Sequence, residues 1–150
     1  MSQLLVVVQI AGRRCALGAH DVKSVIELGA ITPVPRTADF IAGIAALRSQ
    51  SLTVIDCRRA LGFDAALWPT DDRAAVVGSG GHSYALMVDG IEDITTATGD
   101  PGQVPGGFGP EWSRIATGMI ETMTGPALLI DLPALIAGPE SPRGEIEVAA

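Results

Sequence analysis

The chain has 150 residues, of which 47% are hydrophobic but only 4% aromatic, and its formal net charge is −7. This length predicts a single domain that removes roughly 70% of its unfolded surface from water on folding. With one lysine and nine scattered arginines, the chain lacks the clustered cations that bind nucleic-acid phosphates or anionic membranes, so both classes of partner are excluded.

The first apolar run, Leu4–Ile10, is too short to span a bilayer. No cation precedes it, and Arg13 and Arg14 follow it, which is the reverse of a secretory signal. The two cysteines, Cys15 and Cys57, form no disulfide framework, in agreement with a reducing compartment. We therefore expect a cytoplasmic protein.

The start of the chain predicts a hairpin followed by an extended segment. A turn at 12–14 joins a strand at Leu4–Ile10 to a strand at Cys15–Ala19. After a short break the chain continues extended to Leu28. The following Pro33-x-Pro35 excludes a helix, because each proline lacks an N–H donor and restricts the residue before it.

A second hairpin and a short helix are expected next. Residues 38–43 predict a tight turn with Phe40 packed inward. The two strands of the hairpin are expected at Ile44–Leu47 and Leu52–Ile55, and its bend is expected at 49–51. Asp56 is then the predicted N-cap of a short helix, Cys57–Leu61, which ends at Gly62.

The second half of the chain repeats this plan. Its strands are expected at Ala74–Val77, Ser83–Val88, Ile91–Thr98, Ile115–Glu121 and Ala127–Ile130, with a long loop at 99–110 and a helix from Asp131. Gly78, Gly80 and Gly81 predict a hairpin turn and not a phosphate loop, because neither a Lys-Ser/Thr pair nor a helix follows them.

The two halves also align directly. Gly12–Val25 lies without gaps over Gly81–Ile94, an offset of 81 − 12 = 69 residues, and Asp56 falls on Asp131, an offset of 131 − 56 = 75. The larger second offset indicates an insertion, which fits the stretch 99–110. A duplicated unit of short strands and dense turns predicts an all-β fold of two small barrels packed about a pseudo-two-fold seam.

This organisation places the subdomain junction between Phe63 and Asp72. Subdomain 1 is expected at about 11–62, with the pairing of the strand at 4–10 left open, and subdomain 2 at about 73–137. Residues 138–150 are rich in Pro, Glu and Gly and predict a mobile tail.

Five motifs in order resemble the CheW-like domain over Leu4 to about Ile136. They are Val22-x-x-Val25, Pro33-x-Pro35, Phe40-Ile41-x-Gly43-Ile44-x-x-Leu47-Arg48, Val54-Ile55-Asp56-x-Arg58 and Leu86-x-Val88-Asp89-x-Ile91-x-Asp93-Ile94. The resemblance implies two five-stranded SH3-like barrels and a non-enzymatic coupling protein without cofactor or metal. It also implies two partners, the cytoplasmic tip of methyl-accepting chemotaxis receptors and a CheA-type histidine kinase, whose regulatory domain has the same fold.

By this resemblance, the receptor's helical hairpin docks in the groove between subdomains. The receptor-binding residues expected are Val22, Val25, Gly43, Leu47 and Arg48. The two valines offer an apolar strip to a helix, with an ordinary core role as the alternative. Arg48 offers a planar fork for carboxylates or for carbonyls at a helix end, with a surface ion pair as the alternative.

Three departures from the family pattern accompany these residues. Ser49 replaces a glycine whose backbone the family motif needs, so the bend should change, and Thr53 replaces a proline. Ser24 stands where a carboxylate is common, so no ion pair with Arg48 is expected. The departures point to altered receptor binding or to a pathway other than flagellar chemotaxis.

The alternative function is a small-molecule carrier or thiol-dependent β-barrel enzyme that uses the interbarrel groove with Cys57 or His82. Cys57 lies in the first turn of a predicted helix, where the dipole lowers a thiol pKa, although most free cysteines are apolar fillers. Asp56, Asp89 and Asp131 suggest a carboxylate cluster, but Asp56 and Asp131 are repeat equivalents at the starts of helices, so capping is favoured over an acid–base set. His20 and His82 with the cysteines lack the spacing of a zinc site.

Overall fold

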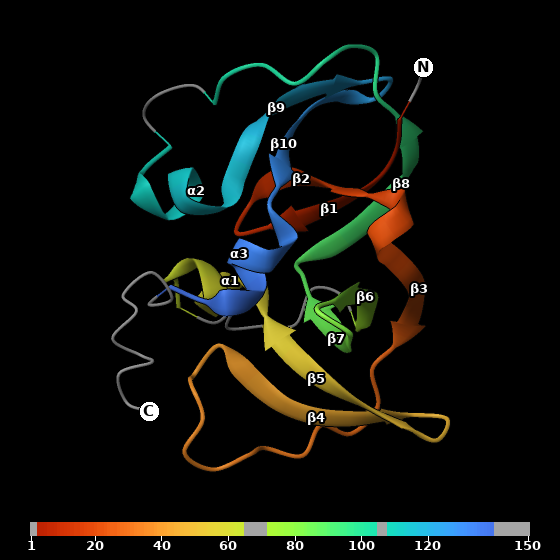
Figure 1. Ribbon diagram of the computed structural model, residues 1–150, viewed down its shortest axis with the longest axis vertical. Helices are drawn as coiled ribbons and strands as arrows, with labels where there is room; N and C mark the ends of the chain where they lie inside the picture. Colours follow the sequence, from red (N-terminus) through yellow and green to blue (C-terminus); the bar gives the residue numbers. More distant parts are fainter. Residues whose placement is uncertain (1–2, 65–71, 105–107, 140–150) are drawn as a thin grey trace.

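The computed structural model describes residues 3–64, 72–104 and 108–139 (Figure 1). Its strands are β1 (Leu4–Ile10), β2 (Arg13–Gly18), β3 (Val22–Glu27), β4 (Ile41–Leu47), β5 (Gln50–Asp56), β6 (Arg73–Ser79), β7 (His82–Met87), β8 (Gly90–Thr96), β9 (Ala116–Thr122) and β10 (Gly125–Ile130). Its helices are the 3-10 turn η1 (Ala19–Asp21) and the α-helices α1 (Cys57–Leu61), α2 (Pro110–Ile115) and α3 (Leu132–Ala137). None of the helices in these ranges has the length and apolar character needed to cross a membrane.

The strands form two five-stranded sheets with the same internal order. The first sheet runs β8-β1-β2-β10-β9 and the second runs β3-β6-β7-β5-β4. Replacing each strand of the first sheet by its repeat equivalent reproduces the second sheet, which confirms the duplication expected from the sequence. Each sheet therefore combines the first hairpin of one repeat with the three later strands of the other.

This exchange of hairpins divides the chain differently from the contiguous subdomains expected at 11–62 and 73–137. The hairpin β1–β2 joins the sheet of the second repeat, where Val8 pairs with both Cys15 and Ile91. The hairpin β6–β7 joins the sheet of the first repeat, where β7 runs parallel to β5 from Thr53 opposite Tyr84. Neither repeat contains a complete sheet of its own.

The sheets do not close into barrels by continuous pairing of the described strands. In the second sheet, the segment after β3 meets edge strand β4 only in an isolated bridge between Thr32 and Ile44. In the first sheet, Gly102 makes the equivalent bridge to Met119 on β9. Prolines adjoin both bridges, Pro33 in one and Pro101 in the other, and a proline cannot donate to a longer ladder.

The first hairpin of each repeat has the same turn. Ala11 and Gly12 have φ angles of 51° and 81°, and their counterparts Gly80 and Gly81 have 60° and 84°. Two central residues with positive φ match the right-handed twist of a hairpin, and glycine adopts this conformation without steric cost. The predicted hairpin turn at Gly80–Gly81 is confirmed.

The largest core cluster contains buried residues from both repeats, including Val8, Cys15, Ile55, Cys57 and Leu86. The helices α1 and α3 contribute Leu61 and Leu135 to it. Smaller apolar clusters are centred on Leu52 and Val54 in one sheet and on Leu5 and Ile120 in the other. The halves share one core, as the pseudo-two-fold arrangement requires.

Both predicted helix caps are present. The Asp56 carboxylate accepts hydrogen bonds from the N–H groups of Arg58 and Arg59, and the Asp131 carboxylate accepts one from Ala134. Gly62 ends α1 with a φ of 103°, as expected.

Helix α2, in contrast, begins within the expected long loop and ends where a strand was expected. Gly109 precedes it, Pro110 occupies its first turn, and its buried side chains are Trp112 and Ile115. The first repeat has no counterpart of α2, because its residues between Thr32 and Phe40 contain no helix.

Arg114, on α2, joins the ends of the two equivalent helices. Its guanidinium donates to the carbonyl of Ala60 on α1 at 2.6 Å and to the carbonyls of Ala134 and Gly138 at 3.0 and 2.9 Å. Burial lowers the pKa of this guanidinium below its ordinary value. A cation at helix C-termini satisfies carbonyls that have no partner within their own helix.

Candidate docking groove

The edge strands β3 and β8 belong to different sheets and are repeat equivalents, and a groove lies between them. Its volume is about 390 Å³. The lining residues are Val6, Ala19, Val22, Lys23, Ser24, Val25, Arg73, Ile91, Glu92 and Ile94. At the offset of 69 residues, Val22 and Val25 correspond to Ile91 and Ile94, so the groove lies across the pseudo-two-fold axis.

The apolar side chains of the groove fall into an inner and an outer pair. Val22 and Ile91 are half-buried and pack against the main core. Val25 and Ile94 are 42% and 62% exposed, which is unusual for large aliphatic side chains. The two valines therefore differ in their surroundings. Val22 packs against the core, and Val25 faces the groove.

The rims of the groove carry opposite charges. On the side of the second sheet, the Lys23 ammonium donates to Ser83 Oγ at 3.0 Å, and Arg73 donates to the Ile91 carbonyl at 3.2 Å. On the side of the first sheet, the Glu92 carboxylate accepts from Gln9 at 3.1 Å and from Arg14 at 3.2 Å. Lys23 and Glu92 are repeat equivalents, so the rims are matched in position and opposite in sign.

Hydrogen bonds hold Glu92 in its charged form. Donation from Gln9, followed by donation and charge from Arg14, lowers the pKa of the Glu92 carboxyl below its ordinary value of 4.5. The acidic rim is thus ionised at neutral pH.

Gly43, Leu47 and Arg48 belong to β4 and its turn, and none of them lines the groove. Gly43 has a structural role, because a β-carbon there would overlap the carbonyl oxygen of Thr32. Leu47 is half-buried against the cluster that contains Leu52. In the view of Figure 1, the tip of the β4–β5 hairpin projects to the same side of the molecule as β3 and β8.

Arg48 is exposed and occupies the hairpin turn, where its own backbone is left-handed with a φ of 58°. The bend lies at Arg48 and Ser49, because β4 ends at Leu47 and β5 begins at Gln50. The strained position is therefore Arg48 and not Ser49, whose φ is not positive. Strand β4 also begins earlier than expected, at Ile41.

The aspartates do not form an acid–base set. Asp56 and Asp131 cap helices, and their backbone N–H groups donate equivalently to Phe40 and Ile115 carbonyls at 2.8 and 2.7 Å. Asp89 accepts from Arg58 at 3.2 Å and from the N–H of Gly12 at 3.2 Å. Each carboxylate is thus occupied in organising the backbone or an ion pair.

The thiols are unreactive by environment. Burial raises the pKa of Cys15 to about 12 and raises the pKa of Cys57 well above its ordinary value. Desolvation outweighs the helix dipole at Cys57, which is 0% exposed. Within the described ranges, no group of three or more His, Cys, Asp or Glu side chains could hold a metal ion.

The residues predicted from the family motif, Val22 and Val25, lie on one wall of the groove, and those on the other wall were not predicted. Ile91 and Ile94 were not among the predicted site residues. The ungapped alignment of the repeats nevertheless places them on Val22 and Val25. Transferring the predicted site through the repeat would have found both.

Comparisons with known proteins agree with this architecture. The sequence model of the CheW-like domain matches residues 4–140. Among solved structures, the scaffolding protein TtCheW from Thermoanaerobacter tengcongensis is similar with a TM-score of 0.75 and 25% identity, and the match covers 87% of this chain and 89% of that chain. No curated protein matches the chain.

Proposed function

The chain belongs to the CheW-like domain family and is a non-enzymatic scaffold, and from this premise we propose that it couples chemoreceptors to a CheA-type histidine kinase in the cytoplasm. The observation that carries the proposal is the groove between β3 and β8, where the exposed side chains of Val25 and Ile94 face a shared channel. An apolar strip of this kind suits the apolar face of a helix from a receptor's cytoplasmic tip.

The charged rims support the same assignment. Lys23 and Arg73 on one side and Glu92 on the other favour polar contacts around an apolar centre, which is the usual anatomy of a protein interface. Arg48, at the hairpin tip, would extend the receptor contact beyond the groove. Its guanidinium is exposed and can donate to carboxylates or to the carbonyls at a helix end.

The groove is tested by charge substitution at Val25. We expect Val25→Glu to weaken binding of a receptor cytoplasmic-tip fragment by about tenfold or more, because a carboxylate would be desolvated against the bound helix. Val34→Glu is the matched control, since Val34 is 39% exposed and lies outside the groove. Calorimetric titration with the receptor fragment and with a CheA regulatory domain measures both partners.

Loss of receptor binding with retained CheA binding is the expected result for Val25→Glu. Equal receptor affinity for Val25→Glu and the unmodified protein would show that the groove is not the receptor site. Failure of the unmodified protein to bind either partner at tens of micromolar would overturn the coupling function itself.

A second variant tests Arg48. Arg48→Glu should reduce receptor affinity by about tenfold, because it replaces a donor with an acceptor of opposite charge, while the melting temperature stays nearly unchanged. Arg36→Glu is a close control, since Arg36 is also exposed and also has a positive φ, 63° against 58°. A large fall in melting temperature for Arg48→Glu alone would make Arg48 structural.

The alternative of a thiol-dependent enzyme is opposed by the burial and raised pKa of Cys57. His82, the other residue considered for it, is exposed at the start of β7 and lies outside the groove.

A further inference from the structure

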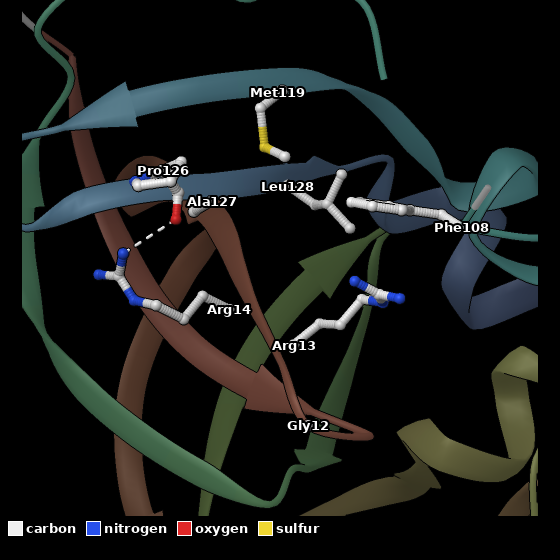
Figure 2. A pocket seen from close by; sticks show the side chains of 8 residues that line it. All are labelled: Gly12, Arg13, Arg14, Phe108, Met119, Pro126, Ala127 and Leu128. Atoms are coloured by element: carbon white, nitrogen blue, oxygen red, sulfur yellow. Dashed lines mark hydrogen bonds between the residues drawn. The ribbon is translucent and has the colours of Figure 1, made fainter. Parts of the chain in front are cut away.

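A second cavity lies in the first sheet, away from the docking groove. Its volume is about 240 Å³, and it is formed by the β1–β2 turn, β9, β10 and the segment that enters α2 (Figure 2). The lining residues are Gly12, Arg13, Arg14, Phe108, Met119, Pro126, Ala127 and Leu128.

The two arginines at this cavity differ in how they are occupied. Arg14 donates to the Pro126 carbonyl at 2.9 Å, to Thr124 Oγ1 at 2.7 Å and to Glu92. Arg13 makes no hydrogen bond or ion pair with the described residues, although it is half-buried. Figure 2 shows the two side chains diverging, with Arg14 toward Pro126 and Arg13 toward Phe108.

Aromatic rings hold the Arg13 guanidinium in place. Its central carbon lies 4.0 Å from the centroid of Phe108 and 5.8 Å from that of Trp112. Stacking on a ring uses the face of the guanidinium and leaves its N–H donors at the edge, in a fixed plane. A carboxylate is the group that such a fork binds best, through two parallel hydrogen bonds.

Beside this cation, part of the cavity wall is apolar. Met119, Ala127 and Leu128 contribute hydrocarbon and a thioether, and a thioether adapts to ligands of different shape. The corresponding place in the other sheet lacks both features, because His82 and Ser83 stand where the arginines are and no residue of the first repeat matches Phe108. The combination exists only where the insertion meets the first hairpin.

We propose that this cavity binds a small monocarboxylic acid with an aromatic or branched apolar body. The carboxylate pairs with Arg13, and the apolar body contacts Met119 and Leu128. The volume is below the usual range for drug-sized ligands, so the acid has about ten non-hydrogen atoms and an affinity in roughly the millimolar range. The site is separate from the docking groove in its lining residues, and Arg14 connects the two by its ion pair with Glu92.

The methionines provide a direct test, because Met119 lines the cavity whereas Met87 and Met123 do not. The full chain, labelled with ¹³C at its methionine methyl groups, is titrated with phenylacetate and with phenylacetamide, its uncharged analogue. We expect phenylacetate to shift the Met119 resonance in a saturable manner and to leave Met87 and Met123 in place. Phenylacetamide should bind at least about tenfold more weakly than phenylacetate, because it forms no ion pair with Arg13.

Arg13→Gln should weaken phenylacetate binding by about tenfold, and Arg36→Gln, which removes an exposed arginine elsewhere, should not. Equal binding of acid and amide would overturn the proposal, as would no shift of Met119 at tens of millimolar acid or unchanged affinity in Arg13→Gln. The comparison of acid with amide uses the unmodified chain, so it decides the question even if Arg13→Gln does not fold.

Discussion

The two repeats share every strand and differ in one α-helix and in the short 3-10 turn η1, and this comparison separates the shared framework from the features of a single repeat. Strands β4 and β9 occupy equivalent positions, as do the capping residues Asp56 and Asp131. Helix α2 has no partner in the first repeat, and it buries Trp112 in the main core and places Arg114 against carbonyls of α1 and α3. The equivalent strands and caps keep their role, whereas Lys23 and Glu92 at the groove differ in charge, and Arg13 beside the second cavity corresponds to His82.

The largest expected effect comes from separating the repeats. Because each sheet needs strands from both, fragments 1–64 and 72–150 should each lack a cooperative thermal transition as monomers, and mixing them should restore one. Circular dichroism melts combined with size-exclusion chromatography measure this. A monomeric fragment that melts cooperatively by itself would contradict the exchanged-hairpin topology.

Equivalent glycines test how closely the repeats match. Gly43→Ala should lower the free energy of unfolding by about 3 kcal/mol, because its β-carbon would overlap the Thr32 carbonyl and its φ of 150° disfavours a side chain. Gly118→Ala should cost about half as much, since its φ is not positive, although its β-carbon would lie 2.7 Å from the Gly102 carbonyl oxygen. Urea denaturation gives both values, with Gly29→Ala, which meets no atom within 4 Å, as the control.

The helix unique to the second repeat should matter through Arg114. Arg114→Met keeps an unbranched apolar stem and removes the donors to three carbonyls, so we expect a loss of about 2 kcal/mol in unfolding free energy. Arg59→Met is the control, because Arg59 pairs with the exposed Asp39 and exposed pairs contribute little. Similar stabilities for the two variants would mean that Arg114 does not join the helix ends.

The smallest effect concerns the charged rims of the groove. The pKa of Glu92 is lowered in the folded state, so its contribution to stability is complete above the unfolded pKa near 4.5 and is lost as pH falls through the lower folded value. Glu92→Gln should therefore flatten the pH dependence of stability below about pH 4.5 and leave it unchanged near neutrality. Urea midpoints measured from pH 3 to 7 provide the comparison. If the pH dependence of stability below about pH 4.5 is the same in Glu92→Gln and in the unmodified protein, Glu92 does not make this contribution.

Local patterns were sufficient for much of the framework. The Gly80–Gly81 turn and the caps at Asp56 and Asp131 follow from residue chemistry within a few positions, and all are found. Helix α2 was hidden because its six residues follow a Gly/Pro-rich stretch, and its formation depends on burying Trp112 and Ile115 against distant strands. No local pattern reports such long-range burial.

The site was less accessible to sequence reasoning than the framework. The exchange of hairpins leaves no trace in local sequence, since β1 is the same continuous apolar run whichever repeat it pairs with. Val25 was found through its motif, whereas Ile94 follows only when the predicted site is transferred to the second repeat at the offset of 69 residues. The left-handed residue of the β4–β5 turn is Arg48, and not Ser49 as the motif had suggested. The strand register leaves a turn of two residues, Arg48 and Ser49, and this register cannot be predicted from local sequence.

Lys23 and Glu92 occupy equivalent positions but carry opposite charges, so they break the two-fold symmetry of the groove. A groove with perfect two-fold symmetry would accept a helix equally well head-first or tail-first, because each orientation would meet the same surroundings. The Lys23 ammonium lies on one wall, and the Glu92 carboxylate lies at the two-fold-related position on the other. The two orientations of a helix in the groove therefore differ in energy. A helix docked in the proposed receptor groove would therefore have one preferred orientation.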